Sequence, residues 1–205
     1  QLAVVRDWLG ETRIERDRQG SPVSIRDHNG RTVRYEWGSM GQRQGMTYPD
    51  GTMVSWTYDS LLRLAEMRRT AEGKDALWVR YHYDTQGRLA EKINSGGYCT
   101  RWNYNETGFL DELTHEDASG ILDRFRYAYD DMGNKTTVWK DRRGLPEESG
   151  AYRYSDDGLQ RLVGIEKDGE LLRRYEYDTF GNRVGMEDYV RGKKSLSKYD
   201  ALDRL

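Results

Sequence analysis

The sequence has few of the residues that usually constrain a small fold. It contains one cysteine, Cys99, and three prolines in 205 residues, so no disulfide can form within the chain. The 33 basic and 35 acidic side chains leave a net charge of −2, which gives no positive footprint for nucleic acid. No apolar run approaches the ~18 residues that a membrane-spanning helix needs. The composition therefore gives no signal for a disulfide-stapled, nucleic-acid-binding or transmembrane protein.

Apolar residues are also scarce, at 36% of the chain against 33% charged residues. A two-layer domain of this length normally has more apolar side chains to bury. Yet the chain carries 15 tyrosines, six tryptophans and three phenylalanines, whereas disordered segments are poor in aromatic residues. This combination favours an ordered single-layer sheet in which aromatic rings cover their neighbours and much of the surface is wet.

A tyrosine–aspartate dipeptide and its close variants recur along the whole chain. We call the first residue of each copy the anchor. Anchors fall at positions 16, 37, 58, 83, 104, 129, 154, 177 and 199, and are 21 to 25 residues apart. An aromatic residue usually lies two positions before the anchor, and glycine lies four positions after it in most copies. The structural repeat positions are Tyr58, Asp59, Tyr81, Tyr83, Asp84, Gly87, Trp102, Tyr104, Gly108, Tyr127, Tyr129, Asp130, Gly133, Tyr152, Tyr154, Tyr175, Tyr177, Asp178, Gly181, Tyr199 and Asp200.

The spacing within each copy is typical of a β-hairpin. Two aromatic residues separated by one position project from the same face of a strand. The aspartate side chain can accept a hydrogen bond from the backbone N–H of the residue two positions later, and glycine tolerates positive φ. A second turn, such as Asn29-Gly30 or Asp168-Gly169, follows each intervening strand. We therefore predict an all-β fold of tandem antiparallel hairpins, two strands per repeat, forming a curved or spiralling sheet, with positive φ at Gly87, Gly133 and Gly181.

One copy is irregular. The segment 159–162 aligns with 61–64 only if two residues are inserted after the anchor Tyr154, which indicates a bulge there. We expect residues 1–205 to form a single array of about nine repeats, with no separate toxin or protease domain. Because the chain opens at Gln1 without a leader and stops at Leu205 inside a copy of the pattern, we expect an array truncated at both ends.

These repeats resemble the Rhs, or YD-repeat, family. Its pattern is Tyr-Asp-x-x-Gly-Arg-Leu or Tyr-Asp-x-x-Gly-Asn-Arg, which residues 83–89 and 177–183 match position by position. The resemblance implies a spiralling β-sheet shell. Similar repeats occur in bacterial wall-associated proteins, toxin-complex subunits and teneurins, and the shell of this family often encloses a C-terminal toxin domain. The family's self-cleavage motif, Asp-Pro-x-Gly, does not occur here, since Pro22, Pro49 and Pro146 all follow other residues.

Candidates for chemistry are weak. His28, His82 and His115 lie at unrelated phases of the repeat, and no second histidine or cysteine is at metal-ligand spacing. Cys99 falls within an expected strand. The acidic stretches at 130–134 and 156–158 coincide with repeat turns and lack the ligand count of a calcium loop. We expect no catalytic, cofactor-binding or metal-binding residue, and therefore no enzyme and no cofactor.

The leading hypothesis is a non-catalytic scaffold within a larger protein. The resemblance implies a secreted or bacterial surface location, with the remainder of the parent chain and an enclosed effector domain as partners. Exposed strand edges also favour self-association. The alternative is a carbohydrate- or cell-surface-binding module that uses exposed aromatic residues. We expect no nucleic-acid partner and no transmembrane segment.

Overall fold

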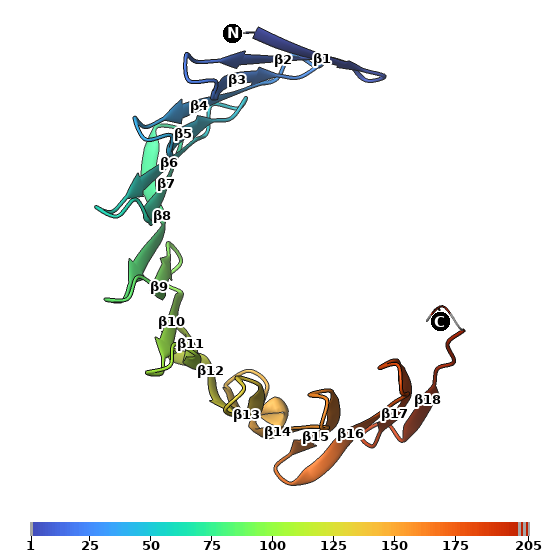
Figure 1. The fold of residues 1–205 in the computed structure, drawn as a ribbon. Coiled ribbons are helices and arrows are strands. Elements are labelled where there is room, and N and C mark those ends of the chain that lie inside the picture. Colours follow the sequence, from blue (N-terminus) through green and yellow to red (C-terminus); the bar gives the residue numbers. More distant parts are fainter. Residues whose placement is uncertain (1, 201, 203, 205) are drawn as a thin grey trace. The chain divides into compact units, whose positions relative to one another are not determined.

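The computed structural model describes residues 2–200, 202 and 204, which form 18 β-strands and one short 3₁₀ turn (Figure 1). Every strand pairing within the units described below is antiparallel, which confirms the predicted all-β hairpin fold. The chain divides into two compact units, residues 1–99 and residues 100–205. Each unit is described separately.

The first unit is a run of hairpins in which each strand pairs with the next one in the sequence. No described strand of this unit packs against a strand that is distant in the sequence. Its strands are β1 (Leu2–Asp7), β2 (Gly10–Arg16), β3 (Pro22–Arg26), β4 (Thr32–Trp37), β5 (Arg43–Thr47), β6 (Met53–Tyr58), β7 (Leu64–Ala71), β8 (Lys74–Tyr83) and β9 (Leu89–Asn94).

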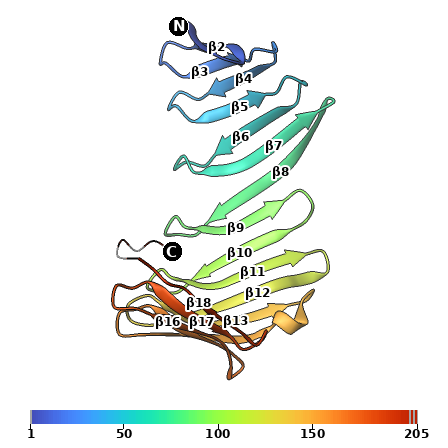
Figure 2. The same ribbon diagram turned by 90° about the vertical axis from the view of Figure 1, so that its right-hand side faces the viewer.

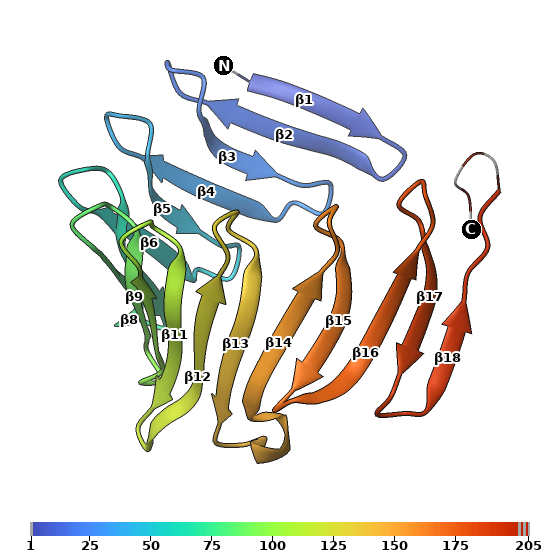
Figure 3. The same cartoon turned by 60° about the horizontal axis from the view of Figure 1, so that its bottom comes forward.

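The second unit repeats this architecture. Consecutive strands from β11 onward again pair with each other, and Figure 3 shows these hairpins side by side. The elements are β10 (Cys99–Tyr104), which begins on the last residue of the first unit, then β11 (Leu110–Asp117), β12 (Gly120–Tyr129), β13 (Lys135–Arg142), η1 (Pro146–Glu148), β14 (Gly150–Asp156), β15 (Leu162–Lys167), β16 (Glu170–Tyr177), β17 (Arg183–Asp188) and β18 (Lys193–Leu196).

The sheet is a single layer with little that is fully buried. Among the described residues, the only buried hydrophobic side chains are Val54 and Val138, and the buried polar ones are Thr114 and Asp188. Most strand residues are half-buried. The low apolar content therefore matches the architecture, because each side chain is covered by its cross-strand neighbours and not by a second layer.

The predicted glycine turns are confirmed. Gly87, Gly133 and Gly181 have φ of 83°, 87° and 93°, a region that side chains rarely adopt. Glycines of the second turn, such as Gly30 and Gly169, also have positive φ. Each repeat is thus two strands joined by two tight turns.

The irregular copy differs from the simple repeat. Its turn is closed by the hydrogen bonds Asp157 N–H to Arg161 O (2.9 Å) and Gln160 N–H to Asp157 O (2.9 Å). The left-handed residue is Gln160, with φ of 60°, while Gly158 has no positive φ. The turn therefore begins two residues later than Tyr154-Ser155 suggests. The anchor position of this copy is Asp156, and Tyr154 lies two residues before it. The predicted two-residue insertion accounts for the shift, and Gln160 takes the left-handed position although Gly158 lies four residues after Tyr154.

The strand register shifts at each described anchor turn within the units, and three hairpins closed by the second turn contain a further β-bulge that the repeat pattern did not predict. In β7–β8, Met67 pairs with Val79 and Arg68 with Leu77, which leaves Trp78 unpaired. In the same way, Leu122 has no partner residue in the β11–β12 register, and Leu172 has none in the β15–β16 register. Figure 2 shows that β7 and β8 extend beyond β6 and β9. The bulge lies where β9 ends, because Val79 pairs with Asn94, the last residue of β9, and Trp78 is next to Val79.

Candidate functional site: the repeat corner

The most strongly recurring arrangement is the turn that follows each anchor, together with the aromatic residue packed on it. We call this the repeat corner. In the copy at 58–63, Asp59 Oδ1 accepts the backbone N–H groups of Leu61 (2.9 Å) and Arg63 (2.9 Å). Its other oxygen, Oδ2, accepts the Nε–H of Arg63 at 2.7 Å. One carboxylate thus satisfies three donors and holds the chain in a reversal.

We call this set of hydrogen bonds, from two backbone N–H groups and one side chain to a single aspartate, the carboxylate clasp. It is present in both units. Asp84, Asp157 and Asp200 accept Nε–H from the arginine four residues later, each at 2.7 Å. In the copies with Asn134 and Asn182, the amide replaces the guanidinium, with Nδ2 to Oδ2 distances of 3.0 and 3.2 Å. This explains why either arginine or asparagine follows the turn glycine, because both present an N–H donor to the aspartate.

The clasp lowers the pKa of its carboxylates. Burial alone would raise the pKa of Asp59 and Asp84, but hydrogen bonds from Arg63 and Arg88 outweigh it, so both pKa values fall below the ordinary aspartate value. At Asp157 the backbone N–H of Arg161 is the largest cause of the same lowering. These aspartates are therefore held ionised as structural acceptors, not as proton donors.

The anchor side chain completes the corner. The Tyr83 hydroxyl on β8 donates to the carbonyl of Leu64 on β7 at 2.9 Å. Burial, and then the nearby Asp59 carboxylate, raises the pKa of Tyr83, which keeps its proton in place. Equivalent bonds run from Tyr58 to Arg43 O (2.7 Å), Tyr129 to Leu110 O (2.8 Å), Tyr177 to Leu162 O (2.9 Å), Tyr199 to Arg183 O (3.3 Å) and, through Nε1, Trp37 to Pro22 O (2.8 Å).

Cations lie over the repeat's aromatic rings. The Arg63 guanidinium lies 4.3 Å from the Tyr83 ring centroid, and that of Arg161 lies 4.8 Å from the ring of Tyr177. Lys135 lies 5.0 Å from the Tyr127 ring. Arg63 and Arg161 also belong to carboxylate clasps, so one guanidinium joins the turn of one repeat to the aromatic ring of the next.

Rings of adjacent repeats are mostly bridged by these cations and do not stack directly. Strands that carry aromatic pairs alternate with intervening strands, so successive pairs are about 10 Å apart, beyond the 4.5–7 Å range of ring contacts. Phe109 reaches Tyr129 (4.9 Å) because it lies at the end of a turn. Tyr127 and Tyr129 approach within 6.5 Å on one strand.

Of the remaining sequence candidates, His82 and Cys99 approach one carboxylate, whereas His115 contacts a hydroxyl on another strand. Thr100 Oγ1 lies 3.0 Å from His115 Nδ1, while His82 and Cys99 both approach Glu91, at 3.9 and 3.5 Å. In the calcium-like stretch, Asp130 accepts from Met132 and Asn134, so its oxygens serve the turn. Over the part of the chain that the structure describes, no group of three or more metal-ligating side chains occurs. Within that part, no helix has the length and apolar character needed to cross a bilayer.

These corners define a class: a tandem β-hairpin repeat protein whose repeats are joined by Tyr–Asp turns. The model of the RHS Repeat family matches residues 16–53. Toxin protein Tse5 of Pseudomonas aeruginosa is 35% identical over 174 residues, which cover 81% of this chain and 12% of that protein. Double-stranded DNA deaminase toxin A of Burkholderia cenocepacia is 27% identical over 205 residues, 82% of this chain and 14% of that protein. The chain belongs to the Rhs, or YD-repeat, family.

Solved structures share the fold. The crystal structure of TcdB2-TccC3-TEV matches 94% of this chain and 12% of its own, with a TM-score of 0.77 at 17% identity. The Photorhabdus luminescens Tc holotoxin pore matches 90% of this chain and 11% of its own, with a TM-score of 0.74, also at 17% identity. The chain therefore spans about an eighth of the length of such proteins.

Proposed function

We propose that the chain is a non-catalytic scaffold, a section of the β-repeat shell of a larger secreted or surface protein. The observation that supports this proposal is the repeat corner, whose aspartate, tyrosine and arginine side chains all form bonds that hold the turns and strands together. Its aspartates accept turn hydrogen bonds, its tyrosines donate to neighbouring carbonyls, and its arginines join clasp to ring. We further propose that residues 1–205 act as one array of about nine repeats, without a toxin or protease domain.

The effector belongs to the rest of the parent chain in this proposal. The relatives named as toxins are matched over only 12% and 14% of their lengths, so most of each protein lies outside the matched region. The repeat section would surround or present such an effector. Its partners are then the remaining parent chain and the effector, and neither nucleic acid nor a cofactor is needed.

Limited proteolysis of the intact parent protein tests this role. We expect the segment that follows the repeats to resist cleavage in the intact protein and to be cut rapidly when residues 1–205 are removed. Equal cleavage rates in the two proteins would show that the repeats shield nothing. The purified repeat chain should also leave DNA and RNA intact, and nuclease or deaminase activity in it would contradict a scaffold role.

The alternative of a carbohydrate-binding module gains little from the repeat aromatics. Their rings are half-buried under cations, and the hydroxyls of anchors such as Tyr83 and Tyr177 already donate to backbone carbonyls. A glycan site therefore has to use an aromatic residue outside the pattern, and the first unit has such a residue in Trp78.

A further inference from the structure

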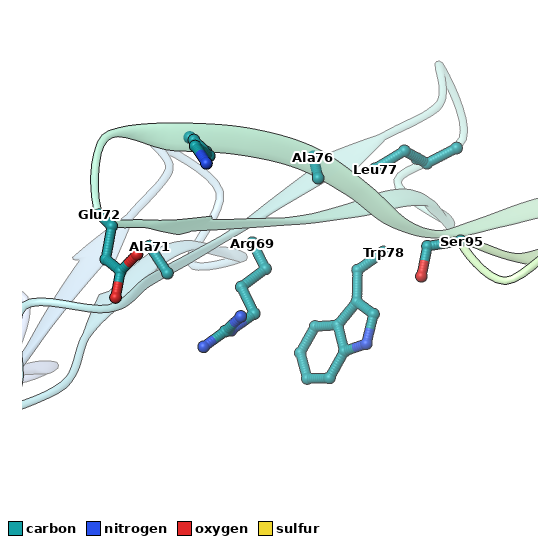
Figure 4. A pocket seen from close by; sticks show the side chains of 8 residues that line it. Arg69, Ala71, Glu72, Ala76, Leu77, Trp78 and Ser95 are labelled. Atoms are coloured by element: carbon teal, nitrogen blue, oxygen red, sulfur yellow. The ribbon is translucent and has the colours of Figure 1, made fainter.

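A hollow of about 470 Å³ lies at the extended end of the β7–β8 hairpin, within the size range of small-ligand pockets. Its lining includes Trp78, Arg69, Glu72, Lys74 and Ser95. Figure 4 shows the Trp78 ring and the Arg69 side chain on the same side of the hairpin, with Ser95 next to Trp78. The hollow is therefore bordered by an aromatic ring, a guanidinium, a carboxylate and a hydroxyl.

The backbone does not require tryptophan at this position. In the hairpins with an extra residue at Trp78, Leu122 or Leu172, the carbonyl of that residue accepts an N–H from the residue just after the next strand. These bonds are Ser95 to Trp78 (3.0 Å), Arg143 to Leu122 (2.9 Å) and Tyr189 to Leu172 (2.9 Å). Leucine serves at two of the three bulges and is half-buried there. Trp78 is 42% exposed, so its ring offers a surface that the bulge does not use.

Arg69 departs from its equivalents in the same way. It is the second residue after the bulge on the facing strand, the position held by Asp117 and Lys167 in the other two hairpins. Asp117 accepts a hydrogen bond from Arg143, and Lys167 donates to the carbonyl of Glu147. The side chain of Arg69 forms no hydrogen bond or ion pair with any residue that the structure describes, and interacts only at longer range with the Asp50 carboxylate, so the N–H groups of its guanidinium can bind a ligand.

We propose that this hollow binds a carboxylate-bearing saccharide. The face of an indole ring carries a partial negative charge and attracts the weakly positive C–H groups of a sugar ring. The guanidinium of Arg69 presents parallel N–H donors that match a carboxylate. Lys74 adds a second positive charge to the lining, where Glu72 is the negative charge, while Asp50 interacts with Arg69 from outside the hollow. Ser95 and Glu72 supply partners for ring hydroxyls. The proposal gives the carbohydrate-binding alternative a specific site, and it stands independently of the scaffold role.

Calorimetric titration of the whole chain with three probes tests the site. The probes are trigalacturonic acid, the neutral trisaccharide maltotriose, and acetate. We expect trigalacturonic acid to bind about tenfold or more tightly than maltotriose, because only it reaches Arg69 with a carboxylate. Acetate should show no saturable binding, since it has no ring to place on Trp78.

Variants separate the ring from the charge. Trp78→Leu introduces the residue found at the other two bulges, so the fold should survive while affinity for both trisaccharides drops about tenfold or more. Arg69→Gln should reduce the affinity for trigalacturonic acid to that for maltotriose. The control is Trp8→Leu, which removes another exposed tryptophan (90% exposed) and should change neither affinity.

Several results would overturn the proposal. They are absence of saturable trigalacturonic acid binding, equal affinity for the two trisaccharides, and binding that Trp78→Leu leaves intact. Displacement of trigalacturonic acid by equimolar acetate would show a simple anion site. Tighter binding of a peptide through its terminal carboxylate would assign the hollow to peptide ligands. In each case the scaffold role, which is measured by proteolysis, would be unaffected.

Discussion

At the scale of single residues, the anchor tyrosine contributes through its hydroxyl as well as its ring. The pattern of alternating aromatics predicts a ring on one face of a strand, and phenylalanine would satisfy that requirement. The structure shows why six anchors are tyrosine or tryptophan: the polar tip of the ring donates to a carbonyl on the preceding strand. Sequence periodicity cannot reveal this bond, because the acceptor is a backbone atom of any residue type.

Replacing Tyr83 with phenylalanine tests that bond. Tyr83→Phe keeps the ring under Arg63 but leaves the Leu64 carbonyl without this donor, so we expect a loss of about 1 kcal/mol in the free energy of unfolding. Tyr98→Phe is the matched control, because Tyr98 is 53% exposed and its hydroxyl has no hydrogen bond to any described residue. Denaturant unfolding measures the stability of both variants. Equal free energies of unfolding would show that the Tyr83 hydroxyl bond does not stabilise the fold.

At the scale of elements, the hairpins could be predicted from the sequence because their signals are local. Alternating aromatics define one strand, and Asp followed by Gly defines the turn after it. The irregular copy could not be placed by these signals alone, since Tyr154-Ser155 and Gly158 have the spacing of a regular anchor and glycine. Only the register shows that Tyr154 faces Ile165 and that Gln160 takes the left-handed position. The bulges at Trp78, Leu122 and Leu172 depend on cross-strand register and were not predicted for the same reason.

Glycine substitutions distinguish the two turn assignments. Gly181→Ala places a side chain at φ of 93° and should destabilise the protein by about 1 kcal/mol or more. Gly158→Ala should be neutral or slightly stabilising, because Gly158 lacks positive φ and a Cβ there meets nothing within 4 Å. Conversely, Gln160→Gly should stabilise the turn. Thermal unfolding of the three variants provides the measurement, and a large loss for Gly158→Ala would restore the unshifted turn.

At the scale of the whole molecule, the carboxylate clasps make stability depend on pH. Because hydrogen bonds lower the folded-state pKa of Asp59, Asp84 and Asp178, the folded state binds fewer protons than the unfolded state. Their stabilisation is complete above the unfolded pKa of about 3.9 and is lost as the pH falls through the lower folded-state values. We expect the urea midpoint to be constant near neutrality and to fall in this acidic range.

The control for the pH dependence is Asp84→Asn, which keeps an acceptor oxygen but removes the charge. Its stability deficit relative to the natural chain should shrink as the pH falls, because the natural carboxylate then becomes neutral too. A deficit that stays constant down to pH values well below the unfolded pKa would mean that charge plays no part in the clasp.

We propose that each unit is a linear array whose repeats are held by local corners. Within each unit, the described strands pack only on their sequence neighbours, so stability should be a sum of local terms. Amide hydrogen exchange of the natural chain and of Gly181→Ala, followed by mass spectrometry, tests this most directly. We predict that protection is lost in the repeats flanking the substitution, from β15 to β18, while β1 to β6 keep theirs. An equal loss of protection along the whole chain would show that the repeats do not unfold locally.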